Sequence, residues 1–179
     1  MLLIGKRASV LTRLAEALHD RGIEAEQVAD VTGGRDAQYE AYQVVAFGRA
    51  VRESDRARMR EGLARANPEV VFVDGYAPVI PLLVAQFEQA LDRRPRARRL
   101  LRDAAVHSGL VDVELRSPCR LEVTSYRLGA FHRTRQRTVF DREVGAGPHS
   151  ATLDSRTARA KQAFVVIRAG DETAALPVG

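Results

Sequence analysis

Basic residues and glycines at three points in the first half of the sequence are candidates for a ligand-binding site. Each group directly follows an apolar run of the kind that forms a buried strand. The three groups are Gly5, Lys6 and Arg7; Gly48 and Arg49; and Asp74, Gly75 and Tyr76. The cations could hold an anionic group, and Asp74 could accept a hydrogen bond or neutralise them. A purely structural, salt-bridged loop edge is the competing interpretation, because charge clusters often serve structure alone.

Two arginine-rich segments in the second half are candidate phosphate-contacting patches. The first comprises Arg93, Arg94, Arg96, Arg98, Arg99 and Arg102, and the second comprises Arg133, Arg135 and Arg137 on one face of a strand. Phosphate contacts position a nucleic acid without reading its sequence. The first segment also fits a linker or helix end, where cations interact favourably with the helix dipole. Few aromatic residues lie near the second segment and the chain has no tryptophan, so base stacking has little support.

Metal and nucleophile chemistry have little support in the sequence. The four histidines are not at zinc-ligand spacing, and Cys119 is the only cysteine. Ser108 and Ser125 lack the G-x-S-x-G context of an activated serine. We therefore expect no metal and no cofactor, and we assign no catalytic residue.

Charge is unevenly distributed along the chain. Residues 1–92 carry 11 basic and 14 acidic side chains, whereas residues 93–179 carry 17 and 9. Only two of the 28 basic residues, Lys6 and Lys161, are lysines, a bias that a GC-rich coding sequence explains most simply. A basic half attracts phosphates or carboxylates at long range. Arginines on outward strand positions are the commoner explanation of such charge.

The sequence has the features of a folded cytoplasmic protein. Its 45% hydrophobic and 28% charged content is ordinary for a globular chain. The first charged residue is Lys6, which leaves too little apolar sequence for a signal peptide. No apolar run approaches the roughly 20 residues that span a bilayer. We expect no membrane partner.

The elements that would position the first candidate group alternate between strand and helix. Apolar runs at 1–5, 23–28, 42–48 and 70–74 predict strands, and helical spacing predicts helices at 10–18, about 54–65 and 79–91. Such β-α units imply a parallel sheet with right-handed connections. Ligands of these sheets bind at the carboxyl ends of the strands, where the three groups lie.

The periodicity changes to two after about residue 100. Alternating runs at 111–115, 121–124 and 164–167 are separated by turn residues near 117, 129, 145–148 and 170, which predicts a β-sandwich. The predicted fold class is therefore α/β plus all-β: a small, truncated, doubly wound parallel sheet followed by an antiparallel Ig-like β-sandwich. We predict an α/β domain at 1–92 without a glycine-rich loop, an arginine-rich linker at 93–102 and the sandwich at 103–179.

The layout of residues 1–91 resembles a degenerate Rossmann-like domain of the short-chain dehydrogenase type. Ala46, Phe47 and Gly48 lie at the place of that family's Asn-Ala-Gly strand end. The family's glycine-rich loop is reduced to Gly5, and no tyrosine is followed by a lysine four residues on. What the resemblance implies is a fold that has lost its cofactor loop and catalytic pair.

Two further resemblances can be stated. One concerns the alternation of strands and helices in the first half, and the other concerns the last 70 residues. A receiver-like fold implies acidic residues after the first strand and an aspartate after the third, but this chain has Gly5-Lys6 and Gly48-Arg49, which disfavours phosphotransfer. The turn at 145–149 and the run at 163–170 resemble Ig-like modules of the flagellar hook-capping type. That likeness implies binding or scaffolding.

The preferred hypothesis is a non-catalytic binding or assembly protein, a pseudoenzyme α/β domain with an interaction sandwich that contacts a protein partner or itself. The first alternative is an enzyme or sensor that binds a small anionic ligand or nucleotide at the strand ends. The second is nucleic-acid binding through the basic half.

Overall fold

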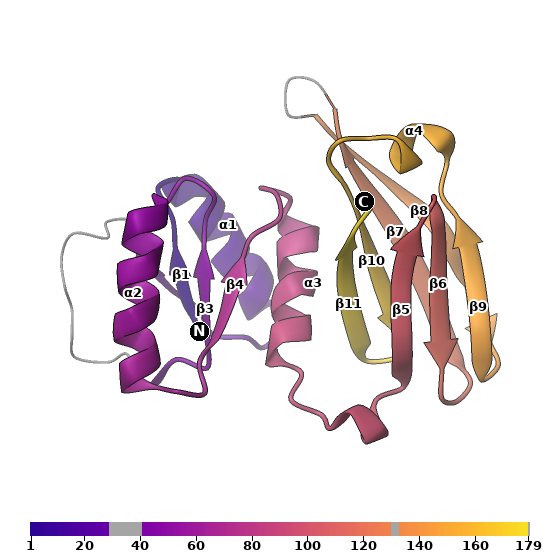
Figure 1. Ribbon diagram of the computed structural model, residues 1–179, viewed down its shortest axis with the longest axis horizontal. Helices are drawn as coiled ribbons and strands as arrows, with labels where there is room; N and C mark the ends of the chain where they lie inside the picture. The colour runs from indigo at the N-terminus through magenta and orange to yellow at the C-terminus, as the bar shows by residue number, and fades with distance from the viewer. Residues whose placement is uncertain (29–40, 130–132, 179) are drawn as a thin grey trace. The chain divides into compact units, whose positions relative to one another are not determined.

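The computed structural model describes residues 1–28, 41–129 and 133–178 (Figure 1). The chain forms two compact units, Met1–Leu91 and Asp92–Gly179, called here the α/β unit and the β unit. The α/β unit contains a four-stranded parallel sheet with helices, and the β unit contains two antiparallel sheets. The predicted fold class, α/β followed by antiparallel β, is confirmed.

The α/β unit alternates strands and helices, as the hydrophobic periodicity predicts. Its elements are β1 (Leu2–Ile4), α1 (Ala8–His19), β2 (Glu26–Val28), β3 (Val44–Phe47), α2 (Glu53–Ala66), β4 (Val71–Asp74) and α3 (Ile80–Leu91). All strand pairs are parallel, in the order β2-β1-β3-β4. The strands are therefore joined by crossover connections rather than hairpins.

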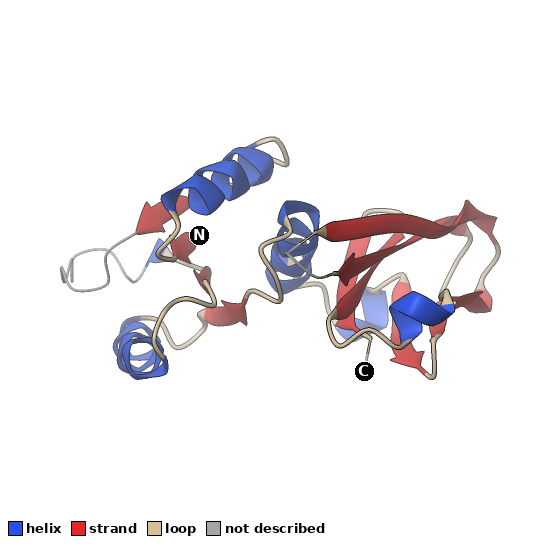
Figure 2. Cartoon of the chain, turned by 90° about the horizontal axis from the view of Figure 1, so that it is seen from above, coloured by secondary structure: helices blue, strands red, loops and turns tan. Residues whose placement is uncertain are grey.

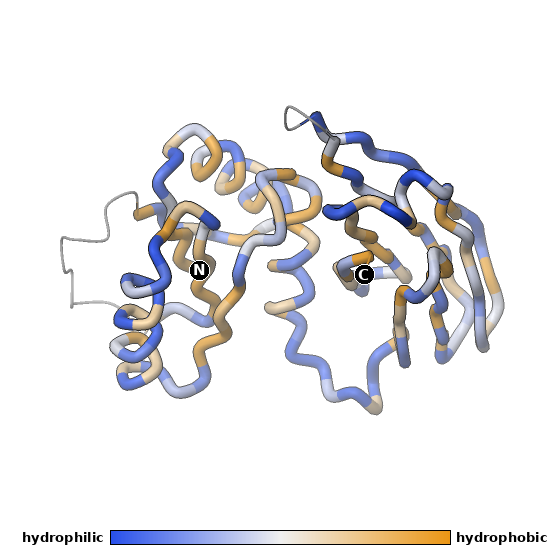
Figure 3. Tube along the Cα trace, turned by 45° about the horizontal axis from the view of Figure 1, so that its top comes forward, coloured by the Kyte–Doolittle hydropathy of each residue, from blue (hydrophilic) through white to orange (hydrophobic). Residues whose placement is uncertain are grey.

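Helices cover both faces of this sheet. Successive strand residues point to opposite faces, so Leu3 packs with α1 and α3 while Leu2 and Ile4 pack with α2. Figure 2 shows α1 and α2 on opposite sides of the strands. In Figure 3 the central strands are mostly hydrophobic, whereas α2 is mostly hydrophilic and buries only Leu63. The unit is doubly wound.

The strand order distinguishes between a dinucleotide-binding sheet and a receiver-like sheet, the two folds to which this unit was compared. Sheets of the dinucleotide-binding type have the order 3-2-1-4, whereas flavodoxin-like and receiver-like sheets have the order 2-1-3-4. The described strands follow the second order. The point where the winding direction reverses lies between β1 and β3, and such a switch point is where doubly wound sheets bind ligands.

The β unit is a sandwich of a three-stranded and a four-stranded sheet. Its elements are η2 (Arg96–Arg98), β5 (Leu101–His107), β6 (Leu110–Leu115), β7 (Cys119–Leu128), β8 (Thr134–Val144), β9 (Gly147–Thr152), α4 (Ser155–Ala158), β10 (Ala163–Ala169) and β11 (Glu172–Pro177). The sheet orders are β5-β6-β9 and β11-β10-β7-β8. The chain passes from one sheet to the other three times, in the Greek-key manner of Ig-like sandwiches.

The core of the β unit lies between its two sheets. Val113 from β6, Val123 from β7 and Ile167 from β10 are each at most 3% exposed and belong to one cluster. Short α4 follows β9, and Leu153 just before it is part of the same core. The start of α4 is therefore anchored to the sandwich interior.

Candidate functional site

The carboxyl ends of β1 and β3 meet closely at the switch point. The backbone N–H of Gly48 donates to the carbonyl of Ile4 at 2.7 Å, and that of Gly5 donates to Val28 at 3.1 Å. A Cβ atom on Gly48 would lie 3.4 Å from the Cα of Gly5, an ordinary van der Waals contact. The structure thus brings these two predicted glycines together.

Asp74 is neutralised by arginines that the sequence analysis did not select. Arg56 and Arg60 of α2 bind its two carboxylate oxygens at 3.3 and 2.6 Å. Arg56 also donates to the carbonyl oxygens of Val51 and Arg49, at 3.1 and 3.2 Å. Asp74 therefore joins α2 to the sheet, which is the structural role named as the competing interpretation. Arg56 and Arg60 lie four residues apart on one helix face, and this spacing was the sequence signal that could have identified them as a pair of cations acting together.

The other predicted residues of this edge lie in loops, and three of them are exposed. Lys6, Arg7 and Arg49 are exposed, and Arg49 donates to the carbonyl of Tyr76 at 3.4 Å. Gly75 donates its N–H to Phe47 at 3.2 Å. Three cations thus remain accessible near the switch point, without Asp74 as their partner.

The first arginine segment lies at one end of the β unit, where carboxylates engage it. Arg94 binds Asp92 and Asp171, each at 2.9 Å, and Glu172 lies 3.5 Å away. These partners raise the pKa of Arg94, through the hydrogen bond to Asp92 above all. Arg99 donates to the carbonyl oxygens of Arg94 and Asp92. Arg96 and Arg98 form η2 and are exposed, as is Arg93.

Further ion pairs extend this end, which we call the paired end. Arg102 lies in β5 and binds Glu114 at 2.8 Å, and Arg120 binds both oxygens of Asp141 at 2.8 and 2.9 Å. Glu172 is only 3% exposed and accepts hydrogen bonds from the backbone N–H groups that lead into β5. Figure 1 shows η2 at this end and α4 at the opposite end.

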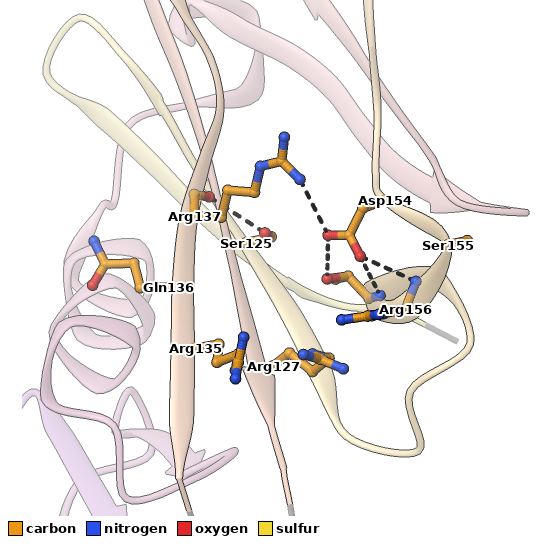
Figure 4. Close-up of a pocket in the computed structure, with 9 residues that line it drawn as sticks. Ser125, Arg127, Arg135, Gln136, Arg137, Asp154, Ser155 and Arg156 are labelled. Carbon is orange, nitrogen blue, oxygen red and sulfur yellow. Dashed lines mark hydrogen bonds and ion pairs between the residues drawn. The ribbon is translucent and has the colours of Figure 1, made fainter.

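The second arginine segment contributes to a pocket at the opposite end. This concavity has a volume of about 450 Å³ and is lined by residues of β7, β8 and α4. Four arginines and one carboxylate carry its charge: Arg127, Arg135, Arg137, Arg156 and Asp154 (Figure 4). We call it the arginine pocket. Of the predicted residues, Arg135 and Arg137 line it, and exposed Arg133 immediately precedes β8.

A β-bulge in β8 directs the pocket arginines to their face. Val123 pairs with Phe140 and Thr124 pairs with Thr138, so Val139 has no partner on β7. Beyond this bulge Arg135 lies opposite Arg127, on the sheet face that Val123 uses for the core. Without the extra residue, the alternation of the strand would send Arg135 to the other face.

Asp154 lies in the pocket, but its oxygens are already occupied. It caps α4 by accepting from the backbone N–H groups of Arg156 and Thr157, both at 3.0 Å. Its second oxygen accepts from the hydroxyl of Thr157 at 2.8 Å and lies 3.9 Å from Arg137. The hydrogen bonds from Thr157 hold the pKa of Asp154 below its usual value. Asp154 therefore offsets at most one positive charge.

The remaining three arginines of the pocket are not paired with acids. Among the residues the structure describes, Arg127, Arg135 and Arg156 make no ion pair with a carboxylate. Arg127 and Arg135 are directly opposed on neighbouring strands, an arrangement that destabilises a sheet when the charges are alike. An anion placed between them would remove that repulsion.

Of the two arginines that the sequence analysis missed, Arg127 could have been found, whereas Arg156 depends on contacts that are remote in sequence. The turn predicted near Gly129 carried a signal for Arg127, since a hairpin there places residues on its two sides opposite each other. No comparable signal pointed to Arg156, which reaches the pocket from the connection between β9 and β10.

Other chemistry is limited within the described part of the chain. No cluster of three or more histidine, cysteine or acidic side chains that could hold a metal ion occurs there. Burial raises the pKa of the Cys119 thiol, which disfavours the reactive thiolate. None of the described helices has the length and apolar character needed to cross a bilayer.

No protein-family model matches the chain, and no curated protein is significantly similar to it. The candidate function therefore rests on the geometry of the sites.

Proposed function

We propose that this chain is a non-catalytic binding protein whose β unit holds an anionic partner in the arginine pocket. The observation that carries the proposal is the charge of the pocket: four arginines surround a single carboxylate whose oxygens are already engaged. Arginine side chains without acidic partners are well suited to bind carboxylate, phosphate or sulfate groups.

The pocket favours binding over turnover because none of its described lining residues is an available general base. Asp154 is the only acidic residue among them, and hydrogen bonds keep this carboxylate ionised and occupied. Arginine remains protonated at any ordinary pH and does not exchange protons with a substrate.

A thermal-shift titration with sodium sulfate and with a polyglutamate peptide, at constant ionic strength, tests the proposal. A ligand that binds only the folded state raises the melting temperature, and the stabilisation grows with the logarithm of the ratio of ligand concentration to Kd. We expect at least one anion to stabilise the protein, and the Arg127→Gln, Arg135→Gln double variant to lose that shift. The Arg120→Gln, Arg142→Gln variant, with the same change in net charge, is the matched control. An equal shift in both variants would contradict the proposal.

A second candidate is a small-anion site at the carboxyl ends of β1 and β3. Its support is the position of exposed Lys6, Arg7 and Arg49 beside the switch point of a doubly wound sheet. A Lys6→Ala, Arg49→Ala variant should then lose a nucleotide-induced or phosphate-induced thermal shift that the arginine-pocket variant retains. If the shift persists in the Lys6 and Arg49 variant, this candidate is excluded.

A further inference from the structure

We propose that the natural occupant of the arginine pocket is a phosphomonoester dianion, held between Arg127, Arg135 and Arg156. This inference rests on the proposed function, because it names the class of anion that the pocket selects. It follows from the charge, the hydrogen-bonding groups and the lining of the pocket.

The charge of the pocket suits a doubly charged group. Four arginines and Asp154 leave three positive charges uncompensated. A carboxylate or a sulfate monoester brings one negative charge and leaves two arginines in mutual repulsion. A phosphomonoester brings about −1.5 to −2 at neutral pH and offsets most of the excess. Charge alone thus ranks the phosphomonoester above the singly charged anions.

The free hydrogen-bonding groups of the pocket are chiefly donors. Each guanidinium is a planar fork of N–H groups with no acceptor. The hydroxyl groups of Ser125 and Thr157 are already donating, to the carbonyl of Arg137 at 3.3 Å and to Asp154 at 2.8 Å. The pocket therefore favours a ligand with several acceptor oxygens and few donors, which describes a terminal phosphoryl group.

The position of the arginines allows several of them to reach one group. Arg127 and Arg135 are directly opposed across β7 and β8, and Figure 4 shows Arg156 of α4 on the side of the pocket that lies toward this pair. Arg137 lies beside Arg135 on the same face but is directed toward Asp154. A phosphoryl group between the three other arginines can accept from each without breaking the Asp154 cap.

The lining argues against a nucleic-acid strand as the occupant. Sequence-tolerant binding of single strands depends on aromatic side chains that stack with bases. None of the described residues that line the pocket is aromatic. Each internal phosphodiester also carries a single charge. A terminal phosphate on a small molecule or on a phosphorylated side chain fits the observations better.

Isothermal titration with phenyl phosphate and phenyl sulfate, at pH 7.5 and pH 5.0, tests this inference. The two probes have the same shape, but only the phosphate gains a second charge, with a pKa near 6. We expect phenyl phosphate to bind roughly tenfold more tightly at pH 7.5, about the effect of one charge-assisted hydrogen bond, and the ratio to fall toward one at pH 5.0.

Two variants separate the geometry of the site from its charge. Arg135→Lys keeps the charge but loses the planar fork, so it should weaken phenyl phosphate roughly tenfold. Arg120→Lys at the paired end is the matched control and should leave affinity unchanged. Equal losses in both variants would show that binding follows general surface charge, and would overturn the inference.

A phosphoserine peptide compared with free phosphoserine identifies the source of the phosphate. Tighter binding of the peptide indicates a phosphorylated protein partner, and equal binding indicates a small phosphoester; both support the inference. If phenyl sulfate or benzoate binds as tightly as phenyl phosphate at pH 7.5, the inference fails while the proposed function stands. If no anion binds to the intact protein, both fail.

Discussion

The two ends of the β unit use the same residue type for different purposes. At the paired end, Arg94, Arg102 and Arg120 each bind a carboxylate within 2.9 Å. At the opposite end, Arg127 and Arg135 are opposed across neighbouring strands and share no acidic partner among the described residues. The first arrangement stabilises the sandwich, and the second keeps positive charge available to a ligand.

Arginine density in the sequence alone would favour the paired end as the anion-binding site, which is the opposite of what the structure indicates. The segment 93–102 has six arginines in ten residues, yet much of its charge is engaged. Its carboxylate partners Asp171 and Glu172 lie more than 70 residues further along the chain. Local charge density therefore does not identify a binding patch unless the fold also leaves the charges without partners.

Removing Glu172 should have the largest effect on stability. Its carboxylate is buried and holds the N–H groups of Leu100 and Leu101 at 2.6 and 2.8 Å. Glu172→Ala leaves these donors without their charged acceptor, and we expect a loss of about 2–4 kcal/mol in the free energy of unfolding. Chemical denaturation measures it. Asp171→Ala is the control, because this exposed neighbour should cost less than about 1 kcal/mol; equal losses would contradict a special role for Glu172.

Asp154 variants distinguish helix capping from charge at the pocket. Asp154→Ala removes the cap of α4 and should cost about 1 kcal/mol, whereas Asp154→Asn retains a good capping residue. The asparagine variant also removes the only negative charge among the described residues that line the pocket, so its affinity for sulfate should rise by about tenfold at low salt. Thermal denaturation and sulfate titration of both variants measure the two effects. Unchanged affinity in Asp154→Asn would mean that the ligand lies elsewhere.

The sequence was sufficient to predict the elements of the α/β unit because its signals are local. Apolar runs identified β1, β3 and β4, and helical spacing identified α1 and α3 to within a few residues. The helix predicted from about residue 54 begins at Glu53, after Arg52, and has no side-chain cap. The order of the strands was not predictable in this way, because β2 and β3 each pair with β1 across a long connection.

The arginine pocket depends on one residue whose effect no local pattern reveals. Strict alternation places Arg135 and Arg137 on one face, but it does not tell which face that is. The unpaired Val139 decides this, because the bulge shifts the pairing of residues 134–138 by one relative to that of residues 140–144. The partners of Asp74 were missed for a related reason: Arg56 and Arg60 approach it only after α2 packs on the sheet.

Arg135 and Arg120 should have opposite effects on the stability of the ligand-free protein. Arg135→Thr relieves the repulsion with Arg127 and inserts a residue with good strand propensity, so we expect a gain of about 0.2–1 kcal/mol. Arg120→Thr breaks the pair with Asp141 and should lower the free energy of unfolding slightly, because the pair is exposed to solvent. Denaturation at low salt and at 1 M salt measures both, and the electrostatic part should disappear at high salt. A loss in Arg135→Thr would show that this arginine stabilises the fold.

Acid should separate ligand binding from fold stability, with a modest effect on the latter. The hydrogen bonds from Arg120 lower the pKa of Asp141, and those from Thr157 lower the pKa of Asp154. Because both pKa values are lowered in the folded state, their stabilising contribution is present above the unfolded value near 4 and is lost as the pH falls below it. As the pH is lowered, phosphomonoester binding should weaken before stability does, near pH 6, where the ligand gains a proton. Melting temperatures between pH 5 and pH 2.5 should fall less steeply in Asp141→Asn than in the native chain; parallel curves would show that the Arg120 pair contributes nothing to stability.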